Sequence, residues 1–294
     1  MKSAFVALVG RPSSGKSTLV NSLCGRKVSI VSPVPQTTRR QVRGIATKND
    51  VQLVLLDTPG LYQSQETLNL YLRSEAARAI EDADLVFYVL DQTRPPGLEE
   101  HAVREIILQS QKKVLVIINK IDQPRRGEWD EFIEPLKEFP QVTISALKNE
   151  GIEKIWEHVQ SMVPDGPFWY SEDYYTDQEP EFRISEIIRE QCFLRLKEEL
   201  PHALYVEISD LENRKNGELL WIRAHVVVER ESQVGIVVGR GGALIKEIRQ
   251  ASQKILREIF ERDIYLDLRV KVVKGWKTDG RVLKRLFPEK KTTD

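Results

Sequence analysis

The residues Gly-Arg-Pro-Ser-Ser-Gly-Lys-Ser at positions 10–17 are the strongest indication of fold class in this sequence. It fits the pattern G-x-x-x-x-G-K-[ST], and it lies between an apolar run at residues 4–9 and a segment with helical character. In a strand–loop–helix unit, the glycines of this pattern let backbone N–H groups surround a phosphate without a Cβ atom in the way. Lys16 can then reach the outer phosphates, and the Ser17 hydroxyl can bind Mg²⁺. The motif therefore predicts a nucleotide-binding loop rather than an ordinary turn.

The first half of the chain alternates short apolar runs with amphipathic stretches. Strands that are apolar throughout are typical of a parallel sheet with helices on both faces. Residues 41–48 are expected to form an antiparallel neighbour of the second strand through a tight turn at Asn49-Asp50. The predicted strands are residues 4–9, 51–56, 85–90, 114–118 and 142–144, and the predicted helices are residues 17–25, 66–83, 98–111, 128–139 and 150–162.

A break in this pattern at Pro164-Asp165-Gly166-Pro167 indicates a domain boundary. The residues that follow are acidic and aromatic with no clear period, so we expect a first domain over residues 1–164 and a linker over residues 165–181. The remaining residues, 182–294, predict the order helix, strand, strand, helix, Gly-x-x-Gly loop, helix, strand. This order describes a smaller α+β module.

The composition suits a soluble protein of the cytosol. Hydrophobic residues make up 41% of the 294 residues, and no apolar run approaches the roughly 20 residues that span a bilayer. The two cysteines, Cys24 and Cys192, lie far apart, which argues against a disulfide framework and favours a cytoplasmic location. The four histidines show no metal-ligand spacing, so a metal hydrolase is excluded.

The net charge of zero hides a basic C-terminal region. Residues 1–180 carry 21 basic and 25 acidic side chains, whereas residues 181–294 carry 23 and 19, and the tail from Arg269 onward carries 9 and 3. A basic surface indicates a polyanionic partner, either nucleic acid or an acidic membrane face. A solvated charged tail explains the charge equally well.

Asn119-Lys120-Ile121-Asp122 follows a predicted strand and points to guanine. A carboxylate only accepts hydrogen bonds, and guanine presents N1–H and an exocyclic amine side by side, whereas adenine presents an unprotonated nitrogen. Leaving such a group unpaired can discriminate by roughly 10⁴-fold. We expect Asn119 to position the loop, the Lys120 stem to cover the ring and the Ala146 N–H to meet guanine O6. Without the other motifs, Asp122 would be read as a helix cap or loop aspartate.

Two further segments are expected to sense the terminal phosphate. Asp57 follows a predicted strand as a metal-binding carboxylate, and the Gly60 N–H is a candidate donor to the γ-phosphate. Thr38 is assigned as the hydroxyl that completes the Mg²⁺ shell, with Thr37 as the alternate. The expected metal ligands are thus Ser17, Thr38 and Asp57, and the expected catalytic residues are Lys16, Thr38 and Gly60. The expected nucleotide contacts are Gly10, Arg11, Pro12, Ser13, Ser14, Gly15, Lys16, Ser17, Thr18, Asp57, Thr58, Pro59, Gly60, Asn119, Lys120, Asp122, Ser145, Ala146 and Leu147.

These motifs, in this order, resemble those of the translation-factor-related GTPases, and nearly the whole chain resembles the bacterial Era GTPase family. Further residues that carry the resemblance are Tyr175-Thr176-Asp177, Glu186-Ile187-Ile188-Arg189-Glu190, Glu199-Leu200-Pro201 and Gly239–Gly242. The resemblance implies an α/β P-loop GTPase domain with a mostly parallel sheet, followed by a type II KH domain. It also implies GTP hydrolysis with Mg²⁺ and binding near the 3′ end of small-subunit ribosomal RNA during 30S assembly. Association with the inner membrane surface, a link to the cell cycle and a monomeric state are further expectations.

Two positions depart from patterns in related GTPases. Leu61 stands where Ras-like GTPases place a water-orienting glutamine, so intrinsic hydrolysis should be slow and another group must help. Relatives in this class often use K⁺ held partly by an asparagine of the phosphate loop, within Gly-Arg-Pro-Asn-Val-Gly-Lys-Ser. Here that position is Ser13, whose hydroxyl is a shorter and poorer ligand. We therefore expect weaker stimulation by K⁺ than in relatives.

The Gly-x-x-Gly loop at residues 239–242 is the expected RNA-binding element. KH domains clamp about four nucleotides of backbone beside such a loop, where glycines allow close approach of phosphates. Leu244 and Ile248, on the following helix, are expected to be core residues rather than RNA contacts. The expected RNA contacts are Ile236, Gly239, Arg240, Gly241, Gly242, Lys246, Lys271 and Lys274.

The preferred hypothesis is a GTP-driven timer in which nucleotide state controls RNA binding. A plain RNA-binding protein with a structural nucleotide site is the first alternative, and intact Lys16, Ser17, Asp57 and Thr38 argue against it. A membrane-surface GTPase that uses the basic tail is the second alternative, weakened by the lack of a lipidation signal.

Overall fold

The chain forms two compact units. The computed structural model describes residues 1–35, 37–60 and 79–287. The first unit comprises Met1–Val31 and Thr38–Asp177, and the second comprises Ser32–Thr37 and Gln178–Asp294. The division between Asp177 and Gln178 falls inside the linker expected at residues 165–181.

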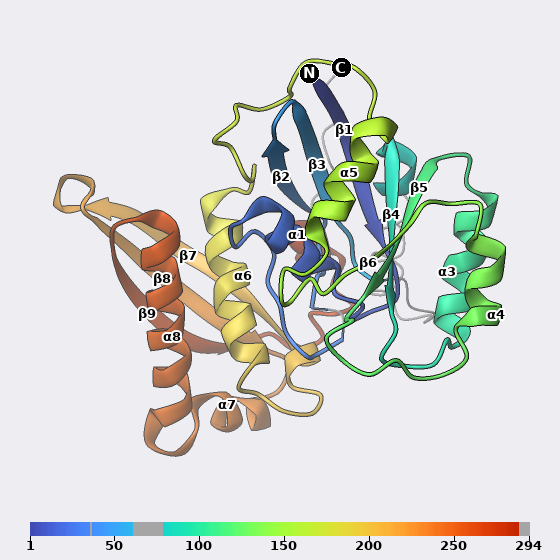
Figure 1. Ribbon diagram of the computed structural model, residues 1–294. Coiled ribbons are helices and arrows are strands. Elements are labelled where there is room, and N and C mark those ends of the chain that lie inside the picture. The colour runs from blue at the N-terminus through green and yellow to red at the C-terminus, as the bar shows by residue number, and fades with distance from the viewer. Residues whose placement is uncertain (36, 61–78, 288–294) are drawn as a thin grey trace. The chain divides into compact units, whose positions relative to one another are not determined.

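A six-stranded sheet forms the centre of the first unit (Figure 1), in the order β2-β3-β1-β4-β5-β6. All neighbouring pairs are parallel except β2 and β3, which are antiparallel and joined through Asn49 in the left-handed region. Every residue of β3 and β4 is buried, as expected for strands covered on both faces. The strands are β1 (Lys2–Val9), β2 (Val42–Lys48), β3 (Val51–Asp57), β4 (Leu85–Asp91), β5 (Lys113–Asn119) and β6 (Gln141–Thr143).

Helices flank this sheet. Val103 and Ile107 of α3 cluster with Val86 and Tyr88, alternate residues of β4 that share one face. The expected helix at 128–139 is shorter and ends in a 3₁₀ turn that contains Pro135, because proline disrupts the hydrogen bonding of a helix interior. Most of the helix expected at 66–83 lies outside the described residues; residues 79–82 are helical. The labelled helices are α1 (Lys16–Cys24), α3 (Leu98–Gln109), α4 (Asp130–Ile133) and α5 (Ile152–Met162).

The second unit has the predicted order of elements around a three-stranded sheet, β7-β8-β9 (Figure 1). Strand β7 is antiparallel to β8, and β9 is parallel to β8. Buried Ile222 and Ala224 alternate with less buried Trp221 and Arg223, so one face of the sheet meets the core. The elements are α6 (Pro180–Phe193), β7 (Leu204–Arg214), β8 (Leu219–Val228), α7 (Glu231–Val238), α8 (Ala243–Phe260), β9 (Asp263–Val272) and α9 (Gly280–Leu286).

Helix α9 lies in the basic C-terminal region, for which the sequence predicted no helix. Trp276 is fully buried, and its indole Nε1–H donates to the Ala203 carbonyl at 3.1 Å. The Asp279 side chain accepts a hydrogen bond from the Arg281 N–H at 2.8 Å and caps the helix. A lone tryptophan among charged residues was the sequence signal for this anchored segment.

Part of the expected linker, residues 168–177, forms a strap along β2 and β3 of the first unit. The fully buried Gln52 accepts hydrogen bonds from the Trp169 and Tyr170 N–H groups at 2.9 and 3.0 Å. The Ile45 N–H donates to the Tyr175 carbonyl at 2.9 Å. These bonds make the strap part of the first unit rather than a free connection. None of the described helices combines the length and apolarity needed to cross a bilayer.

Candidate functional site

The phosphate loop connects β1 to α1 and meets the other motifs at one edge of the sheet. The Asn119 amide nitrogen donates to the Ser14 carbonyl at 2.9 Å, and its Oδ1 accepts from the Ala146 N–H at 3.0 Å. The Thr58 hydroxyl donates to the Leu8 carbonyl at 2.6 Å. The structure therefore gathers four motifs that are separated along the chain, as their positions at the ends of neighbouring strands predicted.

Gly15 cannot carry a side chain in this loop. Its φ is 100°, a conformation that residues with a Cβ rarely adopt, and a Cβ there would lie 2.2 Å from the Asn119 amide nitrogen. Gly60 is similarly restricted, because a Cβ there would lie 2.7 Å from the Pro12 nitrogen. Both glycines allow the loops around the phosphate site to approach closely.

Lys16 lies inside the loop with its ammonium group aimed at the backbone. Its Nζ donates to the carbonyls of Gly10 and Arg11 at 2.9 and 3.0 Å, and the side chain is buried. Burial lowers the pKa of Lys16 to about 8, although the nearby Asp57 carboxylate acts in the opposite direction. A buried cation placed here suits the negative charge of a bound phosphate group.

This lowered pKa predicts that nucleotide affinity falls as the pH rises past 8. The free protein loses the Lys16 proton near pH 8, whereas phosphate groups favour the charged form and raise the pKa in the complex. Binding above pH 8 must then take up a proton, so affinity should approach a loss of about tenfold per pH unit. Fluorescent GDP titrations between pH 7 and 9 measure it, and a constant affinity over this range would contradict the prediction.

Three side chains with oxygen atoms suited to bind a hard metal ion meet beside Lys16. The Ser17 and Thr38 hydroxyls lie 3.0 Å apart, and the Thr38 hydroxyl donates to Asp57 Oδ2 at 3.4 Å. Asp57 is fully buried, and its other oxygen, Oδ1, has no hydrogen bond with the part of the chain that the structure describes. Burial raises the pKa of Asp57. Hydrogen bonds from nearby hydroxyls and the positive charge of Lys16 offset part of this rise. A buried carboxylate beside two hydroxyls suits Mg²⁺.

The structure favours Thr38 over its alternate Thr37. The Thr37 hydroxyl donates to the Val34 carbonyl at 2.6 Å and lies 2.6 Å from the Ser32 hydroxyl. Its hydrogen bonds are therefore made within its own loop, whereas the Thr38 hydroxyl joins the Ser17–Asp57 cluster.

At the base-binding end, a neighbouring hydroxyl orients Asp122. Asp122 is exposed, and its Oδ1 accepts from the Ser145 hydroxyl at 2.6 Å. The Ala146 N–H was expected to meet guanine O6, but here it donates to Asn119 Oδ1. Among the other expected contacts, Leu147 and Ser13 are exposed, Thr18 is half-buried in α1, and Pro12, Ser14, Thr58 and Pro59 are buried. Leu61 lies outside the described residues.

The Arg11 side chain points into the protein rather than toward a ligand. Its Nε lies 2.8 Å from Glu100 Oε2, and its NH2 donates to the Asp91 carbonyl at 2.8 Å. Burial raises the pKa of Glu100 to about 7, although the positive charge of Arg11 acts to lower it. Sequence reasoning missed Asp91 and Glu100 because neither belongs to a recognised motif; the position of Asp91 at the end of β4 was the available signal.

The Gly-x-x-Gly loop lies between α7 and α8 in the second unit. Gly239, Gly241 and Gly242 have φ values of 73°, 59° and 80°. A Cβ at Gly239 would lie 2.6 Å from Leu244 Cβ, whereas a Cβ at Gly241 would meet nothing within 4 Å. Arg240 is exposed. The loop therefore has an open side on which a phosphate backbone could approach.

The exposure of the side chains around this loop agrees only in part with the expectations from the sequence. Ile236 is 57% exposed, and Lys246 and Lys274 are also exposed. Ile248 is fully buried and is a core residue, as expected. Lys271 is exposed but lies 3.3 Å from Glu207, on the face of the sheet away from the core.

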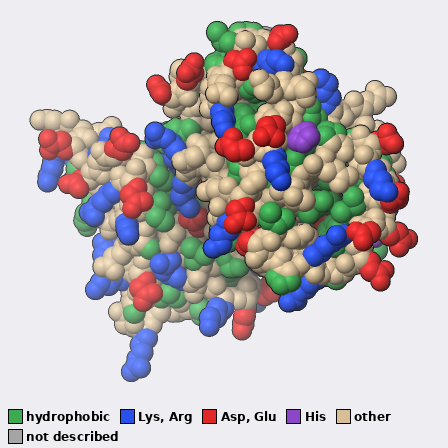
Figure 2. Space-filling view, viewed as in Figure 1, with side chains coloured by type: hydrophobic (Ala, Val, Ile, Leu, Met, Phe, Trp, Pro, Cys, Tyr) green, Lys and Arg blue, Asp and Glu red, His purple; other side chains and the backbone are tan. Residues whose placement is uncertain are grey.

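Several basic side chains of the second unit are paired with acidic neighbours. Arg285 lies 2.7 Å from Glu207, and Arg269 lies 2.9 Å from Asp267. Figure 2 shows both signs of charge interspersed over the visible face of this unit. Net positive charge alone therefore does not define the surface expected to bind RNA, and the exposed Gly-x-x-Gly loop is the more specific feature.

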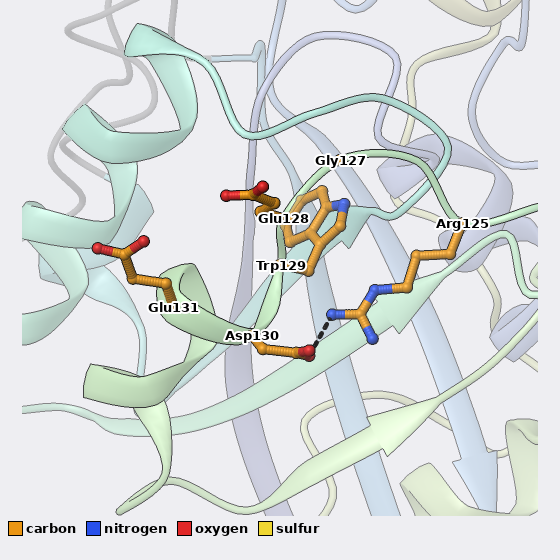
Figure 3. Close-up of a pocket in the computed structure, with 6 residues that line it drawn as sticks. All are labelled: Arg125, Gly127, Glu128, Trp129, Asp130 and Glu131. Atoms are coloured by element: carbon orange, nitrogen blue, oxygen red, sulfur yellow. Dashed lines mark hydrogen bonds and ion pairs between the residues drawn. The ribbon is translucent and has the colours of Figure 1, made fainter.

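A surface hollow beside α4 is separate from these motifs (Figure 3). It is lined by residues 125 and 127–131, with Arg125 and Asp130 paired at 2.7 Å. The Glu128 and Glu131 carboxylates point away from that pair. The Trp129 side chain is buried, and its ring centroid lies 6.0 Å from the Arg11 guanidinium carbon. The hollow contains none of the motif residues, so we do not assign the nucleotide to it.

Known families and proteins match both units of the chain. A family model described as a 50S ribosome-binding GTPase matches residues 5–120, and a KH domain model matches residues 199–277. The GTPase Era of Borreliella afzelii (strain PKo) is 43% identical over 291 residues, which are 98% of this chain and 100% of that protein. The GTPase Era of Treponema denticola is 43% identical over 293 residues, 97% and 99% of the two chains.

The chain belongs to the Era family of GTPases. Solved structures agree: a variant of Aquifex aeolicus Era bound to GDP·AlF4⁻ superposes with a TM-score of 0.92 at 32% identity, covering 98% of this chain and 99% of that one. An Era in complex with MgGDPNP and nucleotides 1506–1542 of 16S ribosomal RNA has the same TM-score at 33% identity and the same coverage. This Era-family protein is therefore a P-loop GTPase with a C-terminal KH domain, as predicted.

Proposed function

We propose that this Era-family GTPase uses GTP to control its binding of small-subunit ribosomal RNA during 30S assembly. The observation that carries the nucleotide part is the cluster of Ser17, Thr38 and Asp57 beside buried Lys16. The open Gly-x-x-Gly loop supports the RNA part. The solved Era complex with nucleotides of 16S ribosomal RNA supports the choice of RNA.

Each group of the nucleotide site has a separate task in this proposal. Ser17, Thr38 and Asp57 hold Mg²⁺, which neutralises phosphate charge when bound. Lys16 provides a fixed cation to the outer phosphates, and Asp122, oriented by Ser145, accepts from guanine. Thr38 belongs to a loop that can report loss of the γ-phosphate, because the loop gains a ligand only while that group is present.

K⁺ is proposed as a weak accessory ion because Ser13 replaces the usual asparagine. We expect little preference for K⁺ over Na⁺ in the hydrolysis rate of the natural protein. Ser13→Asn should increase this preference about tenfold, equivalent to about 1.4 kcal/mol for one added ion contact. Ser13 has a φ of 63°, which asparagine tolerates well, so the variant should keep the loop intact. Strong K⁺ stimulation without the substitution would contradict the proposal.

The RNA contacts are proposed at the Gly-x-x-Gly loop, with exposed Ile236 and Lys246 on either side and Lys274 as an outlying phosphate contact. Lys271 contributes less, because Glu207 already compensates its charge. In this proposal the protein is a cytoplasmic monomer, and any association with the inner membrane surface, or link to the cell cycle, is secondary to RNA.

Gly241→Asp tests the RNA site, with Gly241→Asn as its matched control. Both side chains tolerate the left-handed backbone and both have open space, so they differ mainly in charge. The aspartate should weaken binding of single-stranded ribosomal RNA by about tenfold or more relative to the asparagine, since it faces phosphate groups.

The assay is run with GDPNP and with GDP, and GTP hydrolysis is measured in parallel. Hydrolysis should be unchanged in both variants. Equal RNA affinity of Gly241→Asp and Gly241→Asn would reject the loop as the RNA site, and equal affinity in the two nucleotide states would reject the timer. Stronger binding to anionic vesicles than to RNA would favour a membrane surface instead.

A further inference from the structure

A buried carboxylate at the end of β4 lies directly behind the base-binding loop. Asp91 is fully buried and pairs in register with Asn119 of β5, the first residue of Asn119-Lys120-Ile121-Asp122. Asp91 Oδ2 accepts from the Lys120 ammonium group at 2.8 Å. Its other oxygen, Oδ1, accepts from the Thr93 N–H and hydroxyl at 2.9 and 2.6 Å. Thr93 thereby fixes the orientation of the carboxylate that faces Lys120.

Lys120 has a backbone conformation that needs external support. Its φ is 67°, in the left-handed region that a side chain with a Cβ seldom adopts. Besides the bond from its ammonium group to Asp91, its carbonyl accepts from the Gln92 amide at 3.3 Å. Asp91 and the residue that follows it therefore hold both the ammonium group and the backbone of Lys120.

The same carboxylate also connects to the phosphate loop. Arg94 Nε donates to Asp91 Oδ2 at 3.2 Å, and Arg94 NH2 donates to the Pro12 carbonyl at 3.0 Å. Arg11 NH2 lies 3.9 Å from Asp91 Oδ2. One buried carboxylate thus links the loop expected around the phosphates to the loop expected over the base.

We propose that Asp91 is a positioning residue for nucleotide binding, which holds the Lys120 side chain as a preformed cover for the guanine ring. This inference rests on the proposed base contact of Lys120. Without the carboxylate, the flexible four-carbon stem would have to be ordered when the nucleotide binds, and binding would lose the corresponding free energy. Asp91 acts through Lys120 and does not touch the nucleotide.

The charge state of Asp91 supports this role. Burial would raise the pKa of Asp91, but hydrogen bonds from Lys120 and Thr93 outweigh it, and the pKa lies below its usual range. Asp91 is therefore ionised at neutral pH. Substitution by asparagine would leave Lys120, Arg94 and Arg11 facing an uncharged amide, so the Lys120 ammonium group would lose its charged partner.

The test is a double-mutant cycle on the full-length protein, with Asp91→Asn and Lys120→Met, read out as GDP affinity. Lys120→Met keeps an apolar stem but removes the ammonium group. Each single variant should weaken GDP binding about tenfold. If Asp91 acts mainly through Lys120, most of the loss caused by Asp91→Asn should disappear in the Lys120→Met background, and only the part transmitted through Arg94 to the phosphate loop should remain. Additive losses would overturn the inference.

Steady-state kinetics provide a second readout. The KM for GTP should rise about tenfold in Asp91→Asn while kcat at saturating GTP is retained, because the cover binds ground state and transition state alike. The ratio of GTP to inosine triphosphate affinity should not change, since Ser145 orients Asp122 independently. A fall in kcat with unchanged KM would overturn the inference.

Two further variants separate positioning from general stability. Thr93→Val removes one hydrogen bond to Asp91 and keeps its charge, so it remains informative if Asp91→Asn fails to fold; its smaller loss should also mostly disappear in the Lys120→Met background. Glu100→Gln alters the same buried network through Arg11 without touching Lys120, so its effect should add to that of Lys120→Met. If Lys120→Met binds GDP normally, the bond from the ammonium group to Asp91 is not needed to hold the cover and the inference is wrong; if Lys120→Ala, which removes the stem as well, also binds GDP normally, the proposed base contact itself is wrong. If Lys120→Met binds weakly and the cycle is additive, only the role of Asp91 is wrong.

Discussion

Lys16→Ala should lower single-turnover GTP hydrolysis by about a thousandfold. The substitution removes the buried cation whose ammonium group lies among the carbonyls of the phosphate loop. Removal of one preorganised charge or donor at a reacting centre typically costs about 10²–10³-fold, and Lys16 is also expected to bind the ground-state phosphates. The loss should therefore appear in both the rate and the affinity for GTP.

The measurement is hydrolysis of radiolabelled GTP with protein in excess, together with binding of fluorescent GDP. Lys154→Ala is a suitable control, because Lys154 is an exposed lysine of α5 far from the phosphate loop in sequence. It should match the natural protein in both assays. Turnover by Lys16→Ala within a factor of ten of the natural protein would show that the loop does not bind the reacting phosphates.

Asp122→Asn should reduce the preference for GTP by about 10⁴-fold. The new amide side chain could keep the hydrogen bond from Ser145 through its oxygen, as the Asp122 carboxylate does at 2.6 Å. Its N–H₂ group would then face the N1–H and amine of guanine, so that donors oppose donors. Mismatches of this kind discriminate by roughly 10⁴–10⁵-fold when the site is built for the correct partner. Xanthosine triphosphate, which offers an oxygen at the amine position, should bind the variant better than GTP.

Competition among GTP, ATP and xanthosine triphosphate against fluorescent GDP would measure this change. Ser145→Ala provides a graded control, since it keeps the carboxylate but removes the hydroxyl that orients it. We expect its loss of GTP affinity to be smaller and its nucleotide order to stay the same. An unchanged preference for GTP in Asp122→Asn would refute the base assignment.

The strands and the nucleotide motifs could be predicted from sequence because their signals are local. Residues 51–56 and 85–90 are apolar almost without interruption, and such runs form buried strands wherever a sheet is covered on both sides. The motif positions then follow, since each lies directly after a strand. The order of elements in the second unit was also confirmed, because its helices and strands differ in hydrophobic period.

Contacts between distant segments could not be predicted in this way. Nothing in the local sequence around Arg11 shows that its side chain turns inward to Glu100, 89 positions away. The choice between Thr37 and Thr38 likewise depends on which hydroxyl reaches Asp57. The sequence suggested a solvated tail, but Trp276 is buried against Ala203 and the segment that follows it forms a helix. Local periodicity carries no information on such pairings.

The strap at residues 168–177 determines where the protein can be cut. A fragment that ends at residue 164 would lack three hydrogen bonds of the buried Gln52 side chain. Gln52 accepts two of them from the Trp169 and Tyr170 N–H groups and donates the third to the Tyr170 carbonyl. It would also uncover the outer edge of β2, and an open strand edge invites pairing with another molecule. Such a piece should aggregate, whereas one ending at Asp177 would retain its own edge protection. Biochemical dissection of the catalytic half therefore depends on an aromatic segment that carries no catalytic group.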